Sequence, residues 1–127
     1  MFGRKLGSFE GIQFPLSEHF TNIESVKLLT YKAAWVMDQM YKENRFTHHD
    51  VSLAAAMTKL RDPIYASEVM NEVADWLGAT GYTEEHSIEM GIRGVRSYSI
   101  GAEGTMNIMR IIIARGLLGK DFLPYRQ

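Results

Sequence analysis

Hydrophobic side chains recur along this chain at spacings of three and four residues, and two long glycine-free stretches carry that spacing most clearly. Such spacing places apolar residues on one face of an α-helix. The first stretch runs from about Pro15 to Glu43 and predicts a long helix that can pack in a bundle. Its apolar stripe is formed by Leu16, Phe20, Ile23, Val26, Leu29, Ala33, Val36 and Met40.

The second stretch predicts a helix from about Val51 to Leu77. Its apolar positions change phase beside Pro63, which lacks a backbone donor, so we expect a kink there. Thr47 or Asp50 is a suitable N-cap, and Gly78 is expected to end the helix. The two phases are Leu53, Met57, Leu60 and Ile64, followed by Val69, Val73 and Trp76.

Two shorter helices are predicted at residues 87–98 and 105–118, and no strand pattern competes with them. Four helices with short connections favour an all-α fold, an antiparallel four-helix bundle. The length of 127 residues suits a single domain over residues 1–127.

Charge and composition restrict the function classes. A net charge of −1 gives no reason to expect nucleic acid or an anionic membrane surface as a partner. The longest aliphatic run, residues 111–114, is far too short for a membrane span. The chain has no cysteine, and its first residues, MFGRKLGSFEG, lack the apolar core of a signal peptide. We therefore expect a cytoplasmic protein without disulfides.

Glu103 is the first candidate for chemistry, because it precedes a very apolar stretch that ends on Arg115. A helix N-terminus favours the carboxylate form, whereas an apolar environment raises the pKa of a carboxyl group. A carboxylate between these two effects can act as a general base. The simpler interpretation is a first-turn glutamate that caps a helix.

Two other motifs are weaker. The turn GATGYTEEH, residues 78–86, lets a backbone approach a ligand closely, or simply ends a helix. It is not a dinucleotide-binding G-x-G-x-x-G turn. The adjacent histidines of THHD, residues 47–50, point in different directions on a helix, and no Glu-x-x-His pair occurs. We therefore expect no metal site.

Four segments, in order, resemble the C-terminal helical domain of the acyl-CoA dehydrogenase family. FGRKLGSFEGIQFPLSEH resembles the family's F-G-x-x-L segment, and LLTYKAAWVMDQ resembles its L-x-Y-x-A-A-W helix. LGATGYTEEHSIEMGIRGVR resembles the G-G-x-G-Y turn, and EGTMNIMRIIIAR resembles E-G-T-x-x-I-x-R-x-x-I-A-R. The resemblance covers nearly the whole chain.

The resemblance implies flavin-dependent α,β-dehydrogenation of an acyl-CoA thioester. Glu103 matches the glutamate that removes the α proton in many members, while the β hydrogen leaves as hydride to FAD. Ala102 and Gly104 would contact the substrate at the acyl pocket. The thioester oxygen must be polarised as charge develops on it.

FAD contacts are implied at Phe2, Gly78, Thr105 and Asn107, which match the family pattern. At three further FAD-side positions the chain departs from that pattern. Glu10 and Asp75 stand where the family has glutamine, and Ala79 replaces the second glycine of the turn. Carboxylates near a diphosphate are expected to weaken FAD binding.

The family's N-terminal helical and middle β domains do not occur in these 127 residues. We therefore expect the isolated chain to be inactive and to bind FAD weakly or not at all. The resemblance also implies a homo-oligomer, dimer or tetramer, and an electron-transfer flavoprotein as electron acceptor, although an acyl-CoA oxidase fits the same helices. A non-catalytic helical oligomerisation or binding module derived from this fold is the alternative function.

Overall fold

The structure is a computed structural model that describes residues 3–122 of the 127-residue chain. Over those residues it contains helices and no strands, so the predicted all-α class is confirmed. The elements are η1 (Leu6–Ser8), α1 (Glu10–Glu43), α2 (His48–Leu77), α3 (Ala79–Tyr82), α4 (Ile88–Ile100), α5 (Met106–Leu118) and η2 (Lys120–Phe122).

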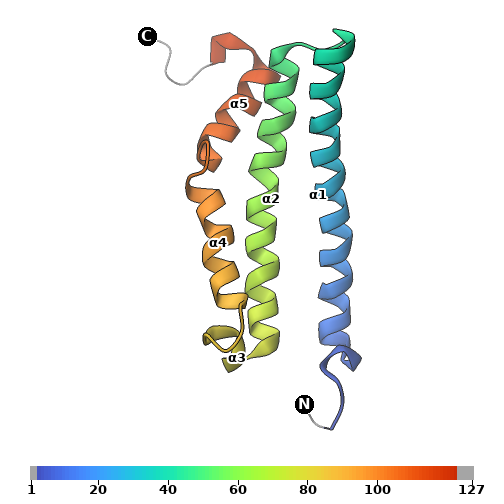
Figure 1. The fold of residues 1–127 in the computed structure, drawn as a ribbon, viewed down its shortest axis with the longest axis vertical. Coiled ribbons are helices and arrows are strands. Elements are labelled where there is room, and N and C mark those ends of the chain that lie inside the picture. Colours follow the sequence, from blue (N-terminus) through green and yellow to red (C-terminus); the bar gives the residue numbers. More distant parts are fainter. Residues whose placement is uncertain (1–2, 123–127) are drawn as a thin grey trace.

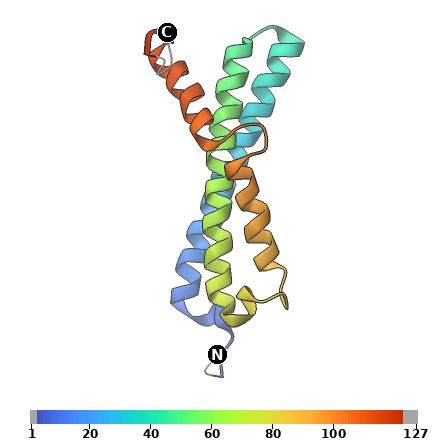
Figure 2. The same ribbon diagram turned by 90° about the vertical axis from the view of Figure 1, so that its left-hand side faces the viewer.

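The helices are arranged in three antiparallel columns with α2 in the centre (Figure 1). α1 packs along one side of α2, and α4 and α5 follow one another along the other side. The four predicted helices therefore do not form four columns. α4 and α5 have 13 residues each, so each spans only about 20 Å and the two together match the length of α2. α5 leans away from the nearby ends of α1 and α2 (Figure 2).

The ends of α2 follow the predicted signals. Thr47 is the N-cap: its side chain accepts from the Asp50 backbone N–H, and the Asp50 carboxylate accepts from the Thr47 backbone N–H at 2.8 Å. This reciprocal capping box satisfies two donors at the start of the helix. Gly78 ends the helix with a φ of 62°. α2 is one continuous helix through Pro63, and the kink expected there stays a prediction.

α1 begins at Glu10, five residues earlier than predicted, and therefore contains Pro15 inside the helix. The first turn of α1 is closed by the backbone N–H groups of Ile12 and Gln13, which donate to the Phe9 carbonyl. α1 ends at Glu43, and its C-cap is Asn44, whose left-handed conformation, with a φ of 54°, is one that asparagine tolerates.

The core is thin, because each outer column contacts α2 on one side only. The buried hydrophobic side chains among the described residues are Val36, Met40, Ala54, Ala56, Tyr65, Met106 and Met109. Much of the predicted apolar stripe of α1 remains in solvent, with Phe20 65% exposed and Leu16 51% exposed. The three-column arrangement thus leaves apolar surface for further contacts.

Candidate functional site

The connection between α4 and α5 carries the candidate base. Ala102, Glu103 and Gly104 have φ values of 48°, 61° and 124°, three consecutive residues in left-handed backbone regions. For alanine and glutamate this conformation costs on the order of 1–2 kcal/mol per residue. Such strain persists where surrounding contacts fix it, and it is concentrated at functional sites. The backbone here is therefore held in a shape that presents Glu103.

Glu103 does not belong to α5. The helix begins at Met106 with Thr105 as its N-cap, and its first turn contains no acidic residue. The simpler interpretation of Glu103 as a first-turn capping residue is therefore wrong. Its side chain is exposed, and no hydrogen bond or ion pair joins its carboxylate to another residue within 3–122. The carboxylate is available to a substrate.

Two contacts fix this loop to the helices. Lys59 of α2 donates from Nζ to the carbonyl oxygen of Tyr98 at 2.8 Å and to that of Gly101 at 3.4 Å. These carbonyls belong to the end of α4, where a cation is favoured. At the other end of the loop, a Cβ on residue 104 would lie 2.9 Å from Cε of the buried Met109. Lys59 and Met109 therefore act as positioning residues for the loop.

The role of Lys59 could not be predicted from the sequence. It lies 39 residues before Tyr98, and no local pattern connects the two. A lysine at this place on a helix looks like any surface lysine until α4 is placed beside α2.

The candidate substrate and cofactor residues form two separate groups. Ala102, Gly104, Thr105 and Asn107 lie at the α4–α5 connection, beside Glu103. The second group, with Gly78 and Ala79, lies at the far end of α4, about 20 Å away by the length of that helix. Glu10 begins α1 at that same end of the molecule (Figure 1). Phe2 lies outside the described residues.

The α5 group suits an anionic or hydroxyl-rich ligand. Thr105 makes no side-chain cap hydrogen bond, so the first backbone N–H groups of α5 stay available as donors. The Asn107 Oδ1 accepts from Arg110 at 2.8 Å, which leaves the amide N–H groups of Asn107 able to donate to a ligand. These donors could hold the phosphate or hydroxyl groups of a cofactor such as FAD.

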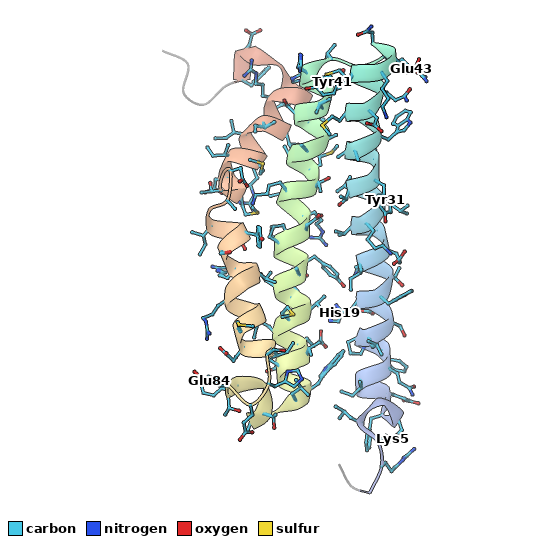
Figure 3. All side chains as sticks on the ribbon, in the orientation of Figure 1. Lys5, His19, Tyr31, Tyr41, Glu43 and Glu84 are labelled. Carbon is cyan, nitrogen blue, oxygen red and sulfur yellow. The ribbon has the colours of Figure 1, made fainter. Side chains whose placement is uncertain are left out.

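The Gly78 group borders a hollow with the size of a binding site, but its charge is unsuitable for an anionic ligand. A hollow of about 750 Å³ lies beside Gly78, and Asp75, Glu84 and Glu89 line it. Arg93 is its one basic residue, and it forms an ion pair with Glu89. Glu84 stands at the α3 end of the molecule (Figure 3). An anionic diphosphate would be repelled here unless a cation compensates, so this group does not fit FAD.

The turn after Gly78 is tighter than predicted, because α3 forms a further helical turn over residues 79–82. A Cβ on Gly81 would lie 2.5 Å from the carbonyl oxygen of Ala74, so only glycine permits this close approach to α2.

No group of three or more histidine, cysteine, aspartate or glutamate side chains could hold a metal ion in residues 3–122. Over those residues, no helix combines the length and apolar character that crossing a bilayer requires.

The chain is similar in sequence to several known proteins. The probable acyl-CoA dehydrogenase YngJ of Bacillus subtilis is 36% identical over 118 residues, which are 92% of this chain and 28% of that protein. The mitochondrial short-chain specific acyl-CoA dehydrogenase of Sus scrofa is also 36% identical, over 92% of this chain and 26% of its own length. A subunit of the caffeyl-CoA reductase-Etf complex of Acetobacterium woodii, CarC, is 33% identical over 94% of this chain and 29% of its own.

A solved structure shares the fold. A chain from work on the electron transferring flavoprotein of Acidaminococcus fermentans superimposes with a TM-score of 0.81 and 32% sequence identity, over 94% of this chain and 29% of that one. This chain therefore spans less than a third of the length of the relatives it matches. Residues 1–118 match the family described as acyl-CoA dehydrogenase, C-terminal domain, and the chain belongs to this family.

Proposed function

We propose that this chain is the C-terminal domain of a flavin-dependent acyl-CoA dehydrogenase in which Glu103 is the catalytic base. The observation that carries the proposal is the strained connection between α4 and α5, which presents an unpaired carboxylate beside the free N-terminus of α5. In this reading residues 1–127 are one helical domain of a longer protein, as the coverage of its relatives supports.

The residues of this chain would perform three tasks. Glu103 accepts the α proton of an acyl-CoA thioester, because its carboxylate has no competing partner. Ala102 and Gly104, its neighbours in the loop, would line the acyl chain. The backbone N–H of Glu103 would donate to the thioester oxygen as negative charge develops there. Thr105 and Asn107 would hold FAD, which would supply the acceptor for the hydride of the β carbon.

Glu103 is exposed in this chain, whereas proton abstraction from a weak carbon acid requires exclusion of water. We infer that the rest of the longer protein and the substrate cover the loop. The isolated chain would then be inactive.

The direct test is Glu103→Gln in the longer protein. Flavin reduction is followed anaerobically with a series of acyl-CoA thioesters. Loss of a general base is expected to slow reduction by about 10²–10⁴-fold, with the bound flavin spectrum unchanged. Glu43→Gln is the matched control, because Glu43 is an exposed glutamate at the far end of α1. Reduction at the native rate by the Glu103→Gln protein would exclude Glu103 as the base.

The second candidate is a non-catalytic helical oligomerisation or binding module. The acidic hollow beside Gly78 favours it, because three carboxylates line a place where the family pattern predicts FAD. This function predicts that the longer protein is purified without flavin, whereas the first predicts stoichiometric flavin.

Two partners follow from the proposal. An electron-transfer flavoprotein is the proposed electron acceptor, since one relative is a subunit of a reductase-Etf complex. A homo-oligomer is supported by exposed area. The chain exposes 9290 Å², whereas a compact monomer of 14.5 kDa exposes about 6,900 Å². A chain with so much excess surface is expected to bury part of it against the rest of the longer protein and against a second subunit.

A further inference from the structure

A single cation joins the strained connection between α4 and α5 to the central helix. Lys59 of α2 donates from Nζ to the carbonyl oxygens of Tyr98 and Gly101, at 2.8 and 3.4 Å. The same ammonium lies 5.6 Å from the centre of the Tyr98 ring. The last carbonyls of a helix have no partner within that helix. Lys59 therefore satisfies two acceptors at the end of α4 from a separate helix.

Gly101 is the point at which this contact reaches the strained residues. Its carbonyl belongs to the peptide unit that joins it to Ala102, the first of the three consecutive residues with positive φ. A peptide unit is planar, so a fixed Gly101 carbonyl also fixes the direction of the Ala102 N–H. Ala102 and Glu103 follow with φ values of 48° and 61°, which are unfavourable for residues with a Cβ. A contact that holds this peptide unit can therefore maintain the strain.

The lysine makes this contact although a carboxylate is close to it on its own helix. Asp62 follows Lys59 by three residues, and positions three apart are neighbours on a helix surface. Both side chains line the same hollow, and Asp62 Oδ1 is buried with no hydrogen-bond partner among the described residues. The ammonium nevertheless donates to the two carbonyls. The end of α4, and not an ion pair within α2, therefore sets the position of the lysine.

The other end of the connection rests on the core. A Cβ on residue 104 would lie 2.9 Å from Cε of Met109, which is buried. Substitution of Met109 would leave a cavity and destabilise the whole protein. Lys59 is half-buried and belongs to no apolar cluster, so its contact can be removed with less damage to the fold.

We propose that Lys59 is a positioning residue for proton abstraction, because its hydrogen bonds to Tyr98 and Gly101 maintain the left-handed backbone that places the Glu103 carboxylate. Lys59 acts through the backbone and not on the substrate. Its role in the reaction rests on the proposed function of Glu103, whereas its effect on the backbone can be measured without that function.

The first experiment measures whether Lys59 maintains the strain. Ala102→Gly is expected to raise the urea midpoint of the 127-residue chain, because glycine adopts a positive φ without a steric penalty. In a Lys59→Met background the backbone is free to relax, so the same substitution is expected to lose most of this increase. Such non-additivity measures the coupling between the two residues.

Two further backgrounds make this comparison specific. Lys59→Gln is expected to retain part of the increase, because its amide can still donate to a carbonyl. Lys42→Met is the matched control and should retain all of it, since Lys42 is an exposed α1 lysine that pairs with Asp38 at 3.1 Å.

The second experiment uses the longer protein with its flavin bound. Lys59→Met is expected to slow flavin reduction at saturating acyl-CoA by about 10–100-fold, since a misplacement of about 1 Å can cost on the order of 100-fold. The half-saturating substrate concentration and the flavin spectrum should not change, because Lys59 acts only on the base. Lys59→Arg should restore much of the rate, because a guanidinium can donate to the same carbonyls. A purely structural role would not separate the rate from the substrate affinity in this way.

The outcomes distinguish the proposal from the function on which it rests. Equal stabilisation by Ala102→Gly in the native chain and in both Lys59 backgrounds excludes Lys59 as the residue that maintains the strain. A native reduction rate in Lys59→Met, or a change in substrate affinity alone, excludes its role in positioning the base. If Glu103→Gln also reduces the flavin at the native rate, the proposed function fails instead, and the stability comparison alone decides whether Lys59 holds the backbone.

Discussion

Ala102 is the residue where the strained loop can be tested most simply. Its φ of 48° lies in a region that glycine adopts without a steric penalty. Ala102→Gly is therefore expected to stabilise the protein by about 0.5–1 kcal/mol in urea denaturation. Ala56→Gly is the control: it lies inside α2 with ordinary helical geometry and is expected to destabilise. A loss of stability in Ala102→Gly would show that residue 102 does not have this conformation.

The carboxyl group of Asp62 predicts that the stability of the folded protein depends on pH. Its pKa is raised in the folded state because burial disfavours the charged carboxylate. The folded state thus retains its proton to higher pH than the unfolded state, so stability is expected to fall as pH rises above 3.8 through the raised pKa. Asp62→Asn should remove this fall.

The size of the effect is expected to be modest, because Asp62 is half-buried. At pH 7 the Asp62→Asn chain should be more stable by about 1 kcal/mol, the low end for an unsatisfied buried group. Below pH 4 the two proteins should be equally stable. The stability of both proteins is measured by thermal denaturation from pH 3 to pH 8. The prediction is contradicted if the difference in stability between them stays constant over that range.

Several side chains show what could be predicted at this scale. Glu103 is recognisable in the sequence as a candidate base, because its charge stands before an apolar stretch. Its place in the α4–α5 connection agrees with the predicted helix start near residue 105. The left-handed backbone at Ala102 could not be predicted, since alanine gives no signal for positive φ. The unsatisfied oxygen of Asp62 arises only when α1 is placed against α2.

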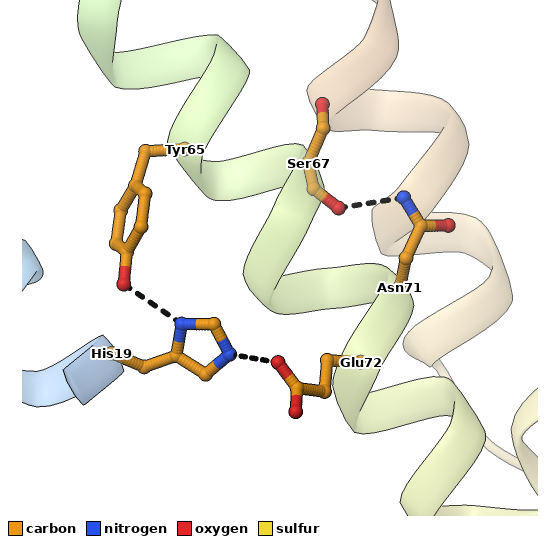
Figure 4. Close-up of polar contacts among 5 residues, drawn as sticks. All are labelled: His19, Tyr65, Ser67, Asn71 and Glu72. Atoms are coloured by element: carbon orange, nitrogen blue, oxygen red, sulfur yellow. Dashed lines mark hydrogen bonds and ion pairs between the residues drawn. The ribbon is translucent and has the colours of Figure 1, made fainter. Parts of the chain in front are cut away.

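At the scale of elements, a polar cluster joins α1 to α2. His19 of α1 bonds through Nδ1 to the Tyr65 hydroxyl at 2.7 Å and through Nε2 to Glu72 (Figure 4). Tyr65 is 4% exposed, and the ring of Trp76 lies 6.2 Å from that of His19. The cluster fixes the register between the two long helices, because each of its members has a partner only in this alignment.

Removal of the hydroxyl from this cluster should weaken the α1–α2 contact. Tyr65→Phe leaves the facing His19 nitrogen without its partner and is expected to cost about 1–2 kcal/mol of stability. Tyr41→Phe is the control, since Tyr41 is 71% exposed and should change stability little. A double-mutant cycle with His19→Ala isolates the pair, and additive effects would show that the two side chains are not coupled.

The element boundaries were predictable where a chemical signal marks them. Thr47 and Gly78 stood at the ends of α2 in the sequence as in the structure. α3 was missed, because its four residues contain a glycine and follow a helix-ending glycine. The stacking of α4 and α5 in one column was missed as well. Helix lengths alone do not show whether two short helices lie side by side or end to end.

At the scale of the whole molecule, three columns leave α2 covered on two sides and α1 on one. Large side chains such as Leu28 and Tyr31 are 67% and 64% exposed on α1. Exposed apolar patches of this extent mark surfaces that contact other polypeptides. The sequence indicated an apolar stripe on this helix, and residues 3–122 bury only part of it: Val36 and Met40 lie in the core, whereas Phe20 stays exposed.

The same incompleteness leads to the last prediction, that the 127-residue chain alone does not retain FAD. Its candidate flavin residues form two groups about 20 Å apart, and the group at Gly78 faces Asp75 and Glu84. The purified chain should show no flavin absorbance, and added FAD should keep its free fluorescence. Asp75→Asn combined with Glu84→Gln should strengthen any residual binding, because two repulsive charges are removed. Stoichiometric FAD in the native chain would show instead that the α5 group suffices, and that the acidic hollow has no part in holding the cofactor.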